Sequence, residues 1–429
     1  MNSLQILSKK YFAVYGLGAT GLSVVNYFKR HNYKNFYTWD DKKNLKGKNF
    51  SKVKFLKFLE KSDYIIVSPG INIRKSPFKK ILIKYKYKII TDLDLYYMMN
   101  SNIKSVVVTG TNGKSTTCKI IEHLLKKNCF DVKLGGNIGK PILDLEVKKN
   151  SIVVIEASSF QLEYSKFVKP KYSILLNITK DHMDWHYNMK NYLNAKLKIF
   201  SLQDNKGYAI LKDKKLIKKF KKEKFLSKLK NINLDSYSHV SNKIKNVYLN
   251  SQANFQNMPF VYELSKILNI KKDNFIKSCN SFKGLSHRHE IFYRKKNVVF
   301  INDSKATSFE SSRYALMSNK NILWIVGGMP KLGDKFYLKK FKKNIIKSFI
   351  IGKNTQFFKN QLKNKINYQI TKNIKKTILV VFNYLKHKKE KNFTILFSPA
   401  SASYDQFKNF EVRGNEFKKL VKLYAAKYI

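Results

Sequence analysis

The chain is poor in cysteine, proline and glycine. Its 429 residues include three cysteines, seven prolines and 17 glycines. Cys118, Cys129 and Cys279 lack the spacing of a metal site and cannot form an even disulfide framework. A fold held together by disulfides is therefore excluded, and we expect a protein of the reducing cytoplasm.

Long apolar runs are also missing. No stretch approaches the roughly 18 residues that crossing a bilayer requires. Near the N-terminus, Lys9 and Lys10 precede a short apolar strand and no signal-peptide core follows. The sequence therefore predicts no transmembrane segment and no secretory leader.

Arginine is scarce although the net charge is strongly positive. The formal charge is +57, and only six of the 85 basic residues are arginine. Nucleic-acid-binding proteins usually concentrate their basic residues and use arginine prominently. Here lysines occur in every segment, so we expect solvated lysine faces whose field helps to gather anionic substrates. A basic nucleic-acid-binding protein is the non-enzymatic alternative.

What the sequence does contain is a phosphate-binding pattern. The β-branched run 106–108 predicts a buried strand, residues 109–117 follow with the sequence TGTNGKSTT, and 118–127 are helical in character. A strand, a glycine loop and a helix N-terminus cradle phosphates, because backbone N–H groups and the helix dipole attract anions. Lys114 can reach the terminal phosphates, although the glycine spacing is shorter than the general Walker pattern.

Oxygen ligands for Mg²⁺ follow the same logic. Ser115 or Thr116 can bind the cation at the helix start. The strand 151–155 ends at Glu156, and a carboxylate at a buried strand end beside a phosphate loop suits a hard cation. His182 stands between two carboxylates after the strand 172–176, where it can ligate a metal or orient a substrate.

A second glycine loop lies near the N-terminus. Residues 16–21, GLGATG, follow a short strand, and the next strand ends at Asp40. This is the opening of a Rossmann-like unit with an acidic residue at the spacing of a dinucleotide site. The same turn binds other diphosphates, so NAD and a UDP-sugar are both open. We favour the UDP-type ligand because an NAD oxidoreductase leaves the phosphate loop unused.

The remaining chain alternates short strands and helices. The strands 298–301, 322–326, 348–351 and 394–397 all end in polar or glycine-bearing loops. Asn254 and Asn257 fall on one face of a helix expected over 253–268, where amides can bind a base or cap a helix. The lysine-rich stretch 205–250 is expected to be irregular.

These features predict an α/β protein of three domains. We expect a Rossmann-like N-terminal domain over 1–92, a P-loop ATPase-like central domain over 93–283, and a Rossmann-like C-terminal domain over 284–429. The length is sufficient for roughly two to four domains with real cores.

Taken together, the motifs resemble the Mur ligase family over nearly the whole chain. The family's phosphate loop, TGTNGK followed by Ser or Thr, matches residues 109–115. Residues 302–307 (NDSKAT), residues 398–410 (SPASASYDQFKNF) and Arg413-Gly414 resemble the members that add D-glutamate. The D-N-P-R string of the members that add diaminopimelate or lysine is absent.

The resemblance implies an ATP-dependent amide ligase of peptidoglycan synthesis. It would join D-glutamate to UDP-N-acetylmuramoyl-L-alanine through an acyl phosphate, with two Mg²⁺ ions. It would be a cytoplasmic monomer without a nucleic-acid partner. Another ligase of the same fold, such as folylpolyglutamate synthase or the alanine-adding muramate ligase, is the alternative.

The resemblance also assigns residues to the ligands. The ATP-binding positions are Gly110, Thr111, Asn112, Gly113, Lys114, Ser115, Thr116, Asn257, Arg288, Asp303 and Lys305. The UDP-sugar positions are Gly18, Ala19, Thr20, Asp40, Gly70, Asn137, Ser158 and Gln161. The D-glutamate positions are Thr307, Lys331, Ser403, Tyr404 and Phe410.

The metal positions include one residue that composition alone leaves ordinary. The resemblance places one Mg²⁺ on Ser115 and Glu156 and a second on His182 and Lys196, where the lysine is carbamylated. Lys114, Glu156, His182 and Lys196 would form the catalytic group.

Three positions depart from the family pattern. Ala253 stands where the family has histidine, Lys42 where arginine is common and Tyr404 where leucine is common. Lysine lacks the bidentate fork of arginine, so the affinity for the sugar nucleotide could differ. None of the three removes a residue that the chemistry requires.

Overall fold

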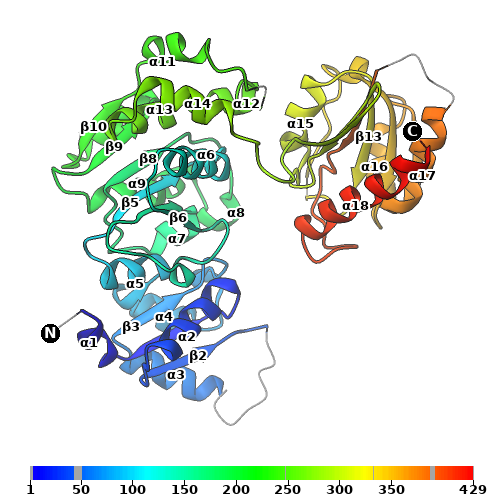
Figure 1. Ribbon diagram of the computed structural model, residues 1–429. Coiled ribbons are helices and arrows are strands. Elements are labelled where there is room, and N and C mark those ends of the chain that lie inside the picture. Colours follow the sequence, from blue (N-terminus) through cyan, green and yellow to red (C-terminus); the bar gives the residue numbers. More distant parts are fainter. Residues whose placement is uncertain (1–2, 43–50, 247, 332, 387–391, 429) are drawn as a thin grey trace. The chain divides into compact units, whose positions relative to one another are not determined.

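The computed structural model describes residues 3–42, 51–246, 248–331, 333–386 and 392–428. The chain forms two compact units. Unit 1 comprises residues 1–250 and 254–282, and unit 2 comprises 251–253 and 283–429. Three mainly parallel sheets with helices packed around them make up these units (Figure 1). The expected α/β class is confirmed.

The first sheet of unit 1 has four parallel strands in the order β2-β1-β3-β4. Its strands are β1 (Phe12–Tyr15), β2 (Phe36–Trp39), β3 (Tyr64–Val67) and β4 (Ile89–Ile90). Its helices are α1 (Ser3–Ser8), α2 (Ala19–Arg30), α3 (Lys52–Lys61) and α4 (Lys79–Lys84), with short 3₁₀ turns at Ile73–Lys75 and Lys86–Lys88.

The second sheet of unit 1 has six parallel strands in the order β10-β9-β8-β5-β7-β6. Its strands are β5 (Lys104–Thr109), β6 (Val132–Gly136), β7 (Ile152–Glu156), β8 (Tyr172–Leu175), β9 (Tyr208–Leu211) and β10 (Lys228–Asn231). Its helices are α5 (Asp92–Met99), α6 (Lys114–Lys127), α7 (Ser159–Tyr164), α8 (Met183–His186), α9 (Met189–Ser201), α10 (Lys214–Lys222), α11 (Leu234–Ser241), α12 (Gln252–Phe255), α13 (Met258–Ile267) and α14 (Lys272–Asn280).

The sheet of unit 2 has the order β11-β12-β16-β13-β14-β15, and only the edge strand β11 is antiparallel. Its strands are β11 (Glu290–Lys295), β12 (Val298–Asn302), β13 (Ile322–Gly327), β14 (Ile345–Ile351), β15 (Tyr368–Lys372) and β16 (Phe393–Phe397). Its helices are α15 (Phe309–Ser318), α16 (Thr355–Leu362), α17 (Ile374–Lys386) and α18 (Phe410–Tyr428).

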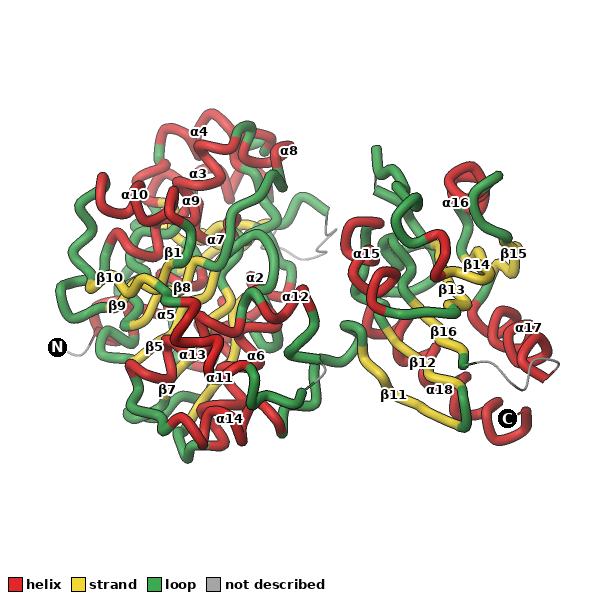
Figure 2. Tube along the Cα trace, turned by 90° about the horizontal axis from the view of Figure 1, so that it is seen from above, coloured by secondary structure: helices red, strands yellow, loops and turns green. Residues whose placement is uncertain are grey.

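Helices cover both faces of the unit 2 sheet, as Figure 2 shows. Leu323 and Ile325 of β13 belong to one buried cluster, while Trp324 and Val326 belong to another. Side chains of a strand alternate between faces, so two clusters along one strand mean that both faces are buried. This is why the inner strands β12, β13 and β16 are largely apolar.

A continuous core joins the two sheets of unit 1. Phe12 of β1, Val107 of β5 and Leu93 of the intervening α5 lie in the same buried cluster. The helix α5 begins with a capping box in which Thr91 and Asp94 exchange hydrogen bonds. The domain boundary expected after residue 92 stays a prediction.

The lysine-rich stretch 205–250 was expected to be irregular, and this is wrong. It folds into β9, α10, β10 and α11. Leu216 and Phe220 are buried one helical turn apart among exposed lysines. This is the apolar stripe of an amphipathic helix, which the lysine composition obscured.

The single helix expected over 253–268 is also wrong. The chain forms α12 and α13, and Asn257 is the N-cap residue of α13. Pro259 in the first turn of α13 explains the break, because proline suits a helix start and not an interior. Asn254 and Asn257 therefore do not share one helical face.

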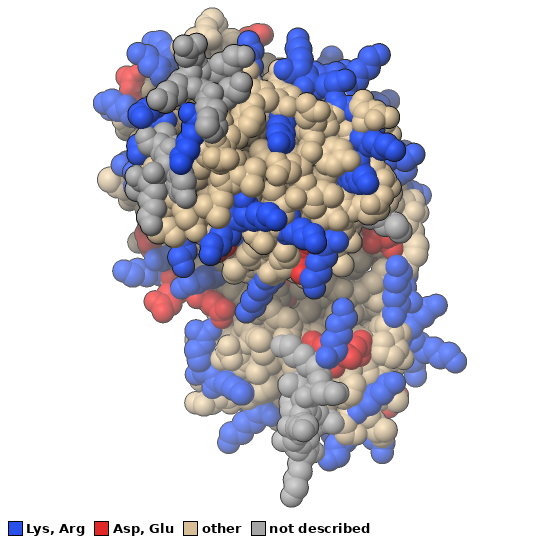
Figure 3. All heavy atoms as spheres, turned by 90° about the vertical axis from the view of Figure 1, so that its right-hand side faces the viewer, with Lys and Arg blue, Asp and Glu red and all other residues tan. Residues whose placement is uncertain are grey.

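Lysine and arginine side chains are scattered over the face seen in Figure 3, with uncharged surface between them. This agrees with the expectation of solvated lysine faces. Among the described residues, no helix combines the length and apolar character that crossing a bilayer demands.

Candidate functional site

The phosphate loop connects β5 to α6. Gly113 is the N-cap residue of α6 and has a φ of +85°, a conformation that L side chains rarely adopt. A Cβ at this position would lie 2.5 Å from the Asn257 side-chain amide nitrogen. The loop needs glycine here for both reasons, and Asn257 lies directly against the loop.

Two lysines converge on this loop. Lys114 Nζ donates to the Gly110 and Thr111 carbonyl oxygens at 2.9 and 2.8 Å. Lys196 Nζ, from α9, donates to the same Gly110 oxygen at 2.8 Å and lies 3.3 Å from Thr109 Oγ1.

Lys196 is 1% exposed. Burial, and secondly the charge of Lys114, hold the Lys196 pKa well below its ordinary value. Burial beside the phosphate loop therefore disfavours the charged form of this amine.

Glu156 presents an unused oxygen at the end of β7. Asn137 Nδ2 donates to Glu156 Oε1 at 2.8 Å. Glu156 Oε2 is buried and has no hydrogen-bond partner among the described residues. A buried carboxylate oxygen without a donor suits a cation. Ser115 and Thr116 are buried in the first turn of α6, which fits the expected Mg²⁺ position.

The described residues offer few carboxylate ligands for a second metal ion. Within the described ranges, no group of three His, Cys, Asp or Glu residues could hold a metal ion. Lys196 supplies a ligand oxygen only as a carbamate, and its lowered pKa favours the neutral amine that reacts with CO₂. A second metal on His182 and Lys196 therefore stays a prediction.

His182 lies in a constrained turn before α8. Its φ is +56°, and its Nε2 lies 3.5 Å from Asp181 Oδ2. The imidazole packs on Phe160, with ring centroids 4.7 Å apart. The neighbouring His186 is buried, and Ser159 Oγ lies 3.0 Å from its Nε2. Burial lowers the His186 pKa to about 4, so this imidazole is neutral.

Two residues that the sequence interpretation missed brace the phosphate loop. Asn177 Oδ1 accepts from Asn112 N at 2.9 Å, and Asn177 Nδ2 donates to Asn112 O at 3.0 Å. The Tyr192 hydroxyl lies 3.0 Å from Thr111 Oγ1. Asn177 follows β8 closely, so its place at a strand end was a usable signal; Tyr192 in α9 offered none.

The side chains of Ser158 and Gln161 make hydrogen bonds within the protein. They form the capping box of α7, and Gln161 is 1% exposed. Gln161 Nε2 also lies 3.3 and 3.4 Å from the two oxygens of Asp92. Burial raises the Asp92 pKa to about 6. The contact of Ser158 and Gln161 with the sugar nucleotide stays a prediction.

The first glycine loop and Asp40 lie together. Gly18 is the N-cap of α2, whose first residues are Ala19 and Thr20. Asp40 Oδ2 accepts from Leu17 N at 2.6 Å. The Asp40 carboxylate is thus hydrogen-bonded to the loop that would hold a diphosphate.

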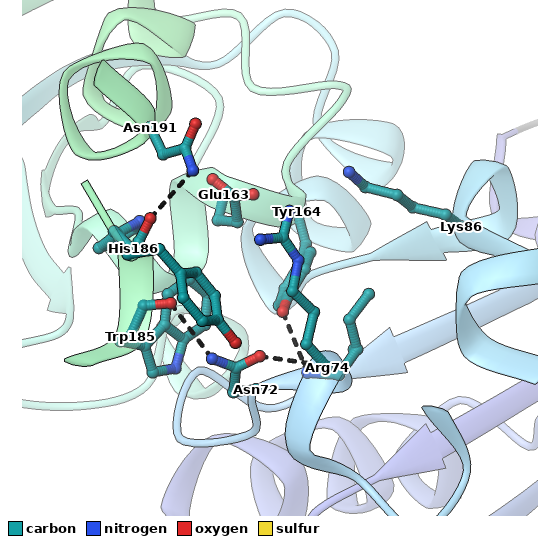
Figure 4. A pocket seen from close by; sticks show the side chains of 10 residues that line it. Asn72, Arg74, Lys86, Glu163, Tyr164, Trp185, His186 and Asn191 are labelled. Carbon is teal, nitrogen blue, oxygen red and sulfur yellow. Dashed lines mark hydrogen bonds between the residues drawn. The ribbon is translucent and has the colours of Figure 1, made fainter. Parts of the chain in front are cut away.

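The loop after Gly70 contacts the segment after His182 (Figure 4). Asn72 Nδ2 donates to the Trp185 carbonyl at 3.2 Å. The Arg74 guanidinium stacks over the Tyr187 ring at 5.0 Å. These contacts link the predicted sugar-nucleotide loop to the predicted metal loop within unit 1.

In unit 2, Asp303 lies buried after β12. Ser398 Oγ donates to its Oδ2 at 2.7 Å, and His289 N donates to its Oδ1 at 3.0 Å. Burial raises the Asp303 pKa to about 7. Lys305 follows closely, with Nζ 4.9 Å from the centroid of the Phe410 ring.

The predicted D-glutamate residues follow the carboxyl ends of strands in unit 2, where ligands bind in open α/β sheets. Thr307 follows β12, Lys331 follows β13, and Ser403 with Tyr404 follow β16. Backbone hydrogen bonds of 2.9 Å in both directions between Met329 and Ala402 join two of these loops. Ser403 is buried, whereas Tyr404 is 72% exposed.

The structure therefore assembles two groups of predicted residues. Unit 1 brings together the phosphate loop, Glu156, Asn137, Lys196 and Asn257. Unit 2 brings Asp303 and Lys305 to loops that also carry Ser403 and Phe410. The predicted contacts of Arg288, Asp303 and Lys305 with ATP stay predictions.

Comparisons with known proteins agree with this arrangement. Residues 108–272 match the Mur ligase middle domain, and residues 10–90 match the Mur ligase MurD-like N-terminal domain. The UDP-N-acetylmuramoylalanine–D-glutamate ligase of Wolbachia pipientis wMel is 33% identical, covering 94% of this chain and 95% of the relative. The enzyme of that name from Rickettsia bellii is 34% identical, covering 97% and 98%.

A solved structure has the same fold. MurF ligase from Thermotoga maritima in complex with ADP superposes with a TM-score of 0.56 at 16% identity, covering 90% of this chain and 94% of that one. At this low sequence identity, the superposition supports a shared fold and nothing more. The Wolbachia and Rickettsia relatives are more similar in sequence and match nearly the whole chain. On that ground the chain belongs to the UDP-N-acetylmuramoylalanine–D-glutamate ligase family of Mur ligases.

Proposed function

We propose that the protein joins D-glutamate to UDP-N-acetylmuramoyl-L-alanine and cleaves ATP to ADP and phosphate, in peptidoglycan synthesis. The main support is the phosphate loop, where Lys114 and Lys196 both donate to the Gly110 carbonyl oxygen. Near the loop, the buried Glu156 Oε2 has no hydrogen-bond partner among the described residues. The relatives named as D-glutamate ligases supply the identity of the substrates.

The chemistry requires an activated carboxylate, because amide formation in water is uphill. The γ-phosphoryl group passes from ATP to the alanyl carboxylate and gives an acyl phosphate. The amine of D-glutamate attacks its carbonyl carbon, and phosphate leaves from the tetrahedral intermediate. The chain needs to supply no nucleophile of its own.

The residues of unit 1 position and neutralise the transferring group. Lys114 exchanges its carbonyl partners for phosphate oxygens and stabilises their charge. Backbone N–H groups at the start of α6 hold the phosphates. Ser115 and Glu156 would hold one Mg²⁺, and His182 with carbamylated Lys196 a second; bound there, the ions would neutralise phosphate charge.

The other assignments are part of the same proposal. Gly18, Asp40 and Gly70 serve the UDP group. Thr307, Lys331, Ser403, Tyr404 and Phe410 serve D-glutamate. The domains run over 1–92, 93–283 and 284–429, and the enzyme acts as a cytoplasmic monomer. The diphosphate-type glycine loop and the polar strand ends support these roles.

Phosphate release tests the proposal directly. The full chain is incubated with ATP, Mg²⁺ and UDP-N-acetylmuramoyl-L-alanine, and a panel of amino acids is added in turn. D-glutamate alone should start phosphate release. Release with L-alanine and UDP-N-acetylmuramate, without a response to D-glutamate, would show that the protein is the alanine-adding ligase instead.

A further inference from the structure

A buried arginine in unit 2 ties two loops to the start of α18. Arg413 is 1% exposed. Its Nε donates to Ser304 Oγ at 3.0 Å. Its Nη2 donates to the carbonyl oxygens of Ser304 and Ser401 at 2.7 and 2.9 Å. One side chain thus bridges the loop after β12 and the loop after β16.

The charge of Arg413 is poorly compensated for a buried cation. Its three acceptors are neutral oxygens, and Nη1 is buried without a hydrogen-bond partner among the described residues. Burial lowers the Arg413 pKa to about 10, and Asp405 acts in the opposite direction. Burying a charge without a hydrogen-bonded counter-ion costs stability, so a buried cation of this kind is weak evidence for a purely stabilising role.

Neighbouring contacts fix α18 in the same place. Ser304 Oγ donates to the Phe410 carbonyl at 2.9 Å, and Asn302 Nδ2 donates to the Gly414 carbonyl at 3.2 Å. A Cβ at Gly414 would lie 2.3 Å from His287 Nδ1. The first turns of the helix therefore pack against the loop after β12 with no spare room.

The bridged segments carry the residues proposed to hold the amino acid. Thr307 lies in the loop after β12, Ser403 and Tyr404 lie in the loop after β16, and Phe410 begins α18. Phe410 also lies under the Lys305 ammonium. A change in the spacing of these segments would move several ligand contacts at once.

We propose that Arg413 is a positioning residue that sets the spacing of the two loops and thereby the affinity of the enzyme for its incoming amino acid. It acts through Ser304 and Ser401. Its role rests on the proposed function, since that function places the amino acid on these loops.

Arg413→Lys tests the role. Lysine keeps the charge, but a single ammonium lacks the planar fork that serves three acceptors in two directions. In steady-state phosphate release by the full chain, we expect KM for D-glutamate to rise about tenfold or more, because an ångström of displacement is sufficient for such losses. KM for UDP-N-acetylmuramoyl-L-alanine, which is assigned to residues of unit 1, should stay within about twofold of the wild type. The surface variant Arg313→Lys, at an exposed ion pair with Glu310, is the matched control and should change neither constant.

Ser304→Ala provides a second variant that spares the charge. It removes the Nε acceptor and the bond to Phe410 but leaves both carbonyl acceptors. We expect KM for D-glutamate to rise about threefold, the loss of a modest hydrogen bond. If Arg413→Lys fails to fold, this variant decides alone.

An unchanged KM for the amino acid overturns the inference, even if the melting temperature or kcat falls, because Arg413 then only holds the fold. Failure of the proposed function is separate and visible in the wild type. If the wild-type protein responds to another amino acid, KM for that amino acid is compared between the wild type and the variants. An unchanged value still overturns the role of Arg413.

Discussion

Lys114 and Lys196 donate to the same carbonyl oxygen, that of Gly110, at 2.9 and 2.8 Å. Two ammonium groups at one acceptor repel each other, and Lys196 is the more deeply buried of the two. The arrangement therefore favours loss of the proton from Lys196, whose pKa burial holds well below its ordinary value. One lysine can serve phosphate and the other can react with CO₂.

Lys114→Ala removes the cation that would neutralise the terminal phosphates. We expect ligation to fall at least about a hundredfold, the usual cost of losing one charge-stabilising donor. Binding of UDP-N-acetylmuramoyl-L-alanine, measured by calorimetry, should survive, because Lys114 is not among the positions assigned to that ligand. Loss of this binding would contradict the assignment.

Lys196→Ala should lower ligation as steeply, by about a hundredfold. Partial recovery with added acetate or formate is expected, because a small carboxylate can replace the carbamate oxygens. The exposed lysine of the same helix, Lys190, is the matched control, and its replacement by alanine should have no effect. An alanine variant at 196 with normal activity would remove the carbamate from the mechanism.

Asn177→Ala should loosen the phosphate loop. It deletes both hydrogen bonds to the Asn112 backbone, which together contribute on the order of 1–2 kcal/mol. We expect KM for ATP to rise about tenfold, since 1.4 kcal/mol corresponds to that factor. Asn177→Asp keeps the acceptor for Asn112 N, but it turns a carboxylate oxygen toward the Asn112 carbonyl and adds a negative charge beside the phosphate loop, so KM for ATP should rise further than in Asn177→Ala. Equal values for both variants would argue against the pairing.

Asp303 should make the stability of unit 2 depend on pH. Its folded pKa, about 7, lies above its ordinary value of 3.8, so the folded state retains a proton that the unfolded state has lost. Between these values stability falls as pH rises, by up to about 4 kcal/mol. Asp303→Asn should reduce this slope in urea unfolding of the full chain between pH 4 and 7, and the buried Asp92 accounts for part of what remains. An identical slope in the variant would place the titration elsewhere.

The sequence predicts most strands because their apolar runs are buried on both faces, as in β13. It finds Glu156 because a carboxylate that ends such a run is conspicuous. It cannot find the pairing of Gln161 with Asp92, or of Arg413 with Ser304, because these partners are distant in the sequence and meet only in the fold.

Local patterns also compete with composition. The buried positions of α10 have ordinary helical spacing, yet six of its nine residues are lysine, so the stretch resembles solvated chain. No local pattern predicts the proposed carbamate of Lys196, since only burial against the phosphate loop distinguishes this lysine from the others of α9.

The core that joins the two sheets of unit 1 limits how this enzyme can be recombined. Phe12, Leu93 and Val107 occupy one apolar interior. A chimera that exchanges the sugar-nucleotide half at residue 92 for that of a relative would pair two surfaces that were never fitted to each other. An exchange near residue 283 follows the division of the chain into its two compact units. The residues proposed to hold the amino acid would move together in such an exchange, because all of them belong to unit 2.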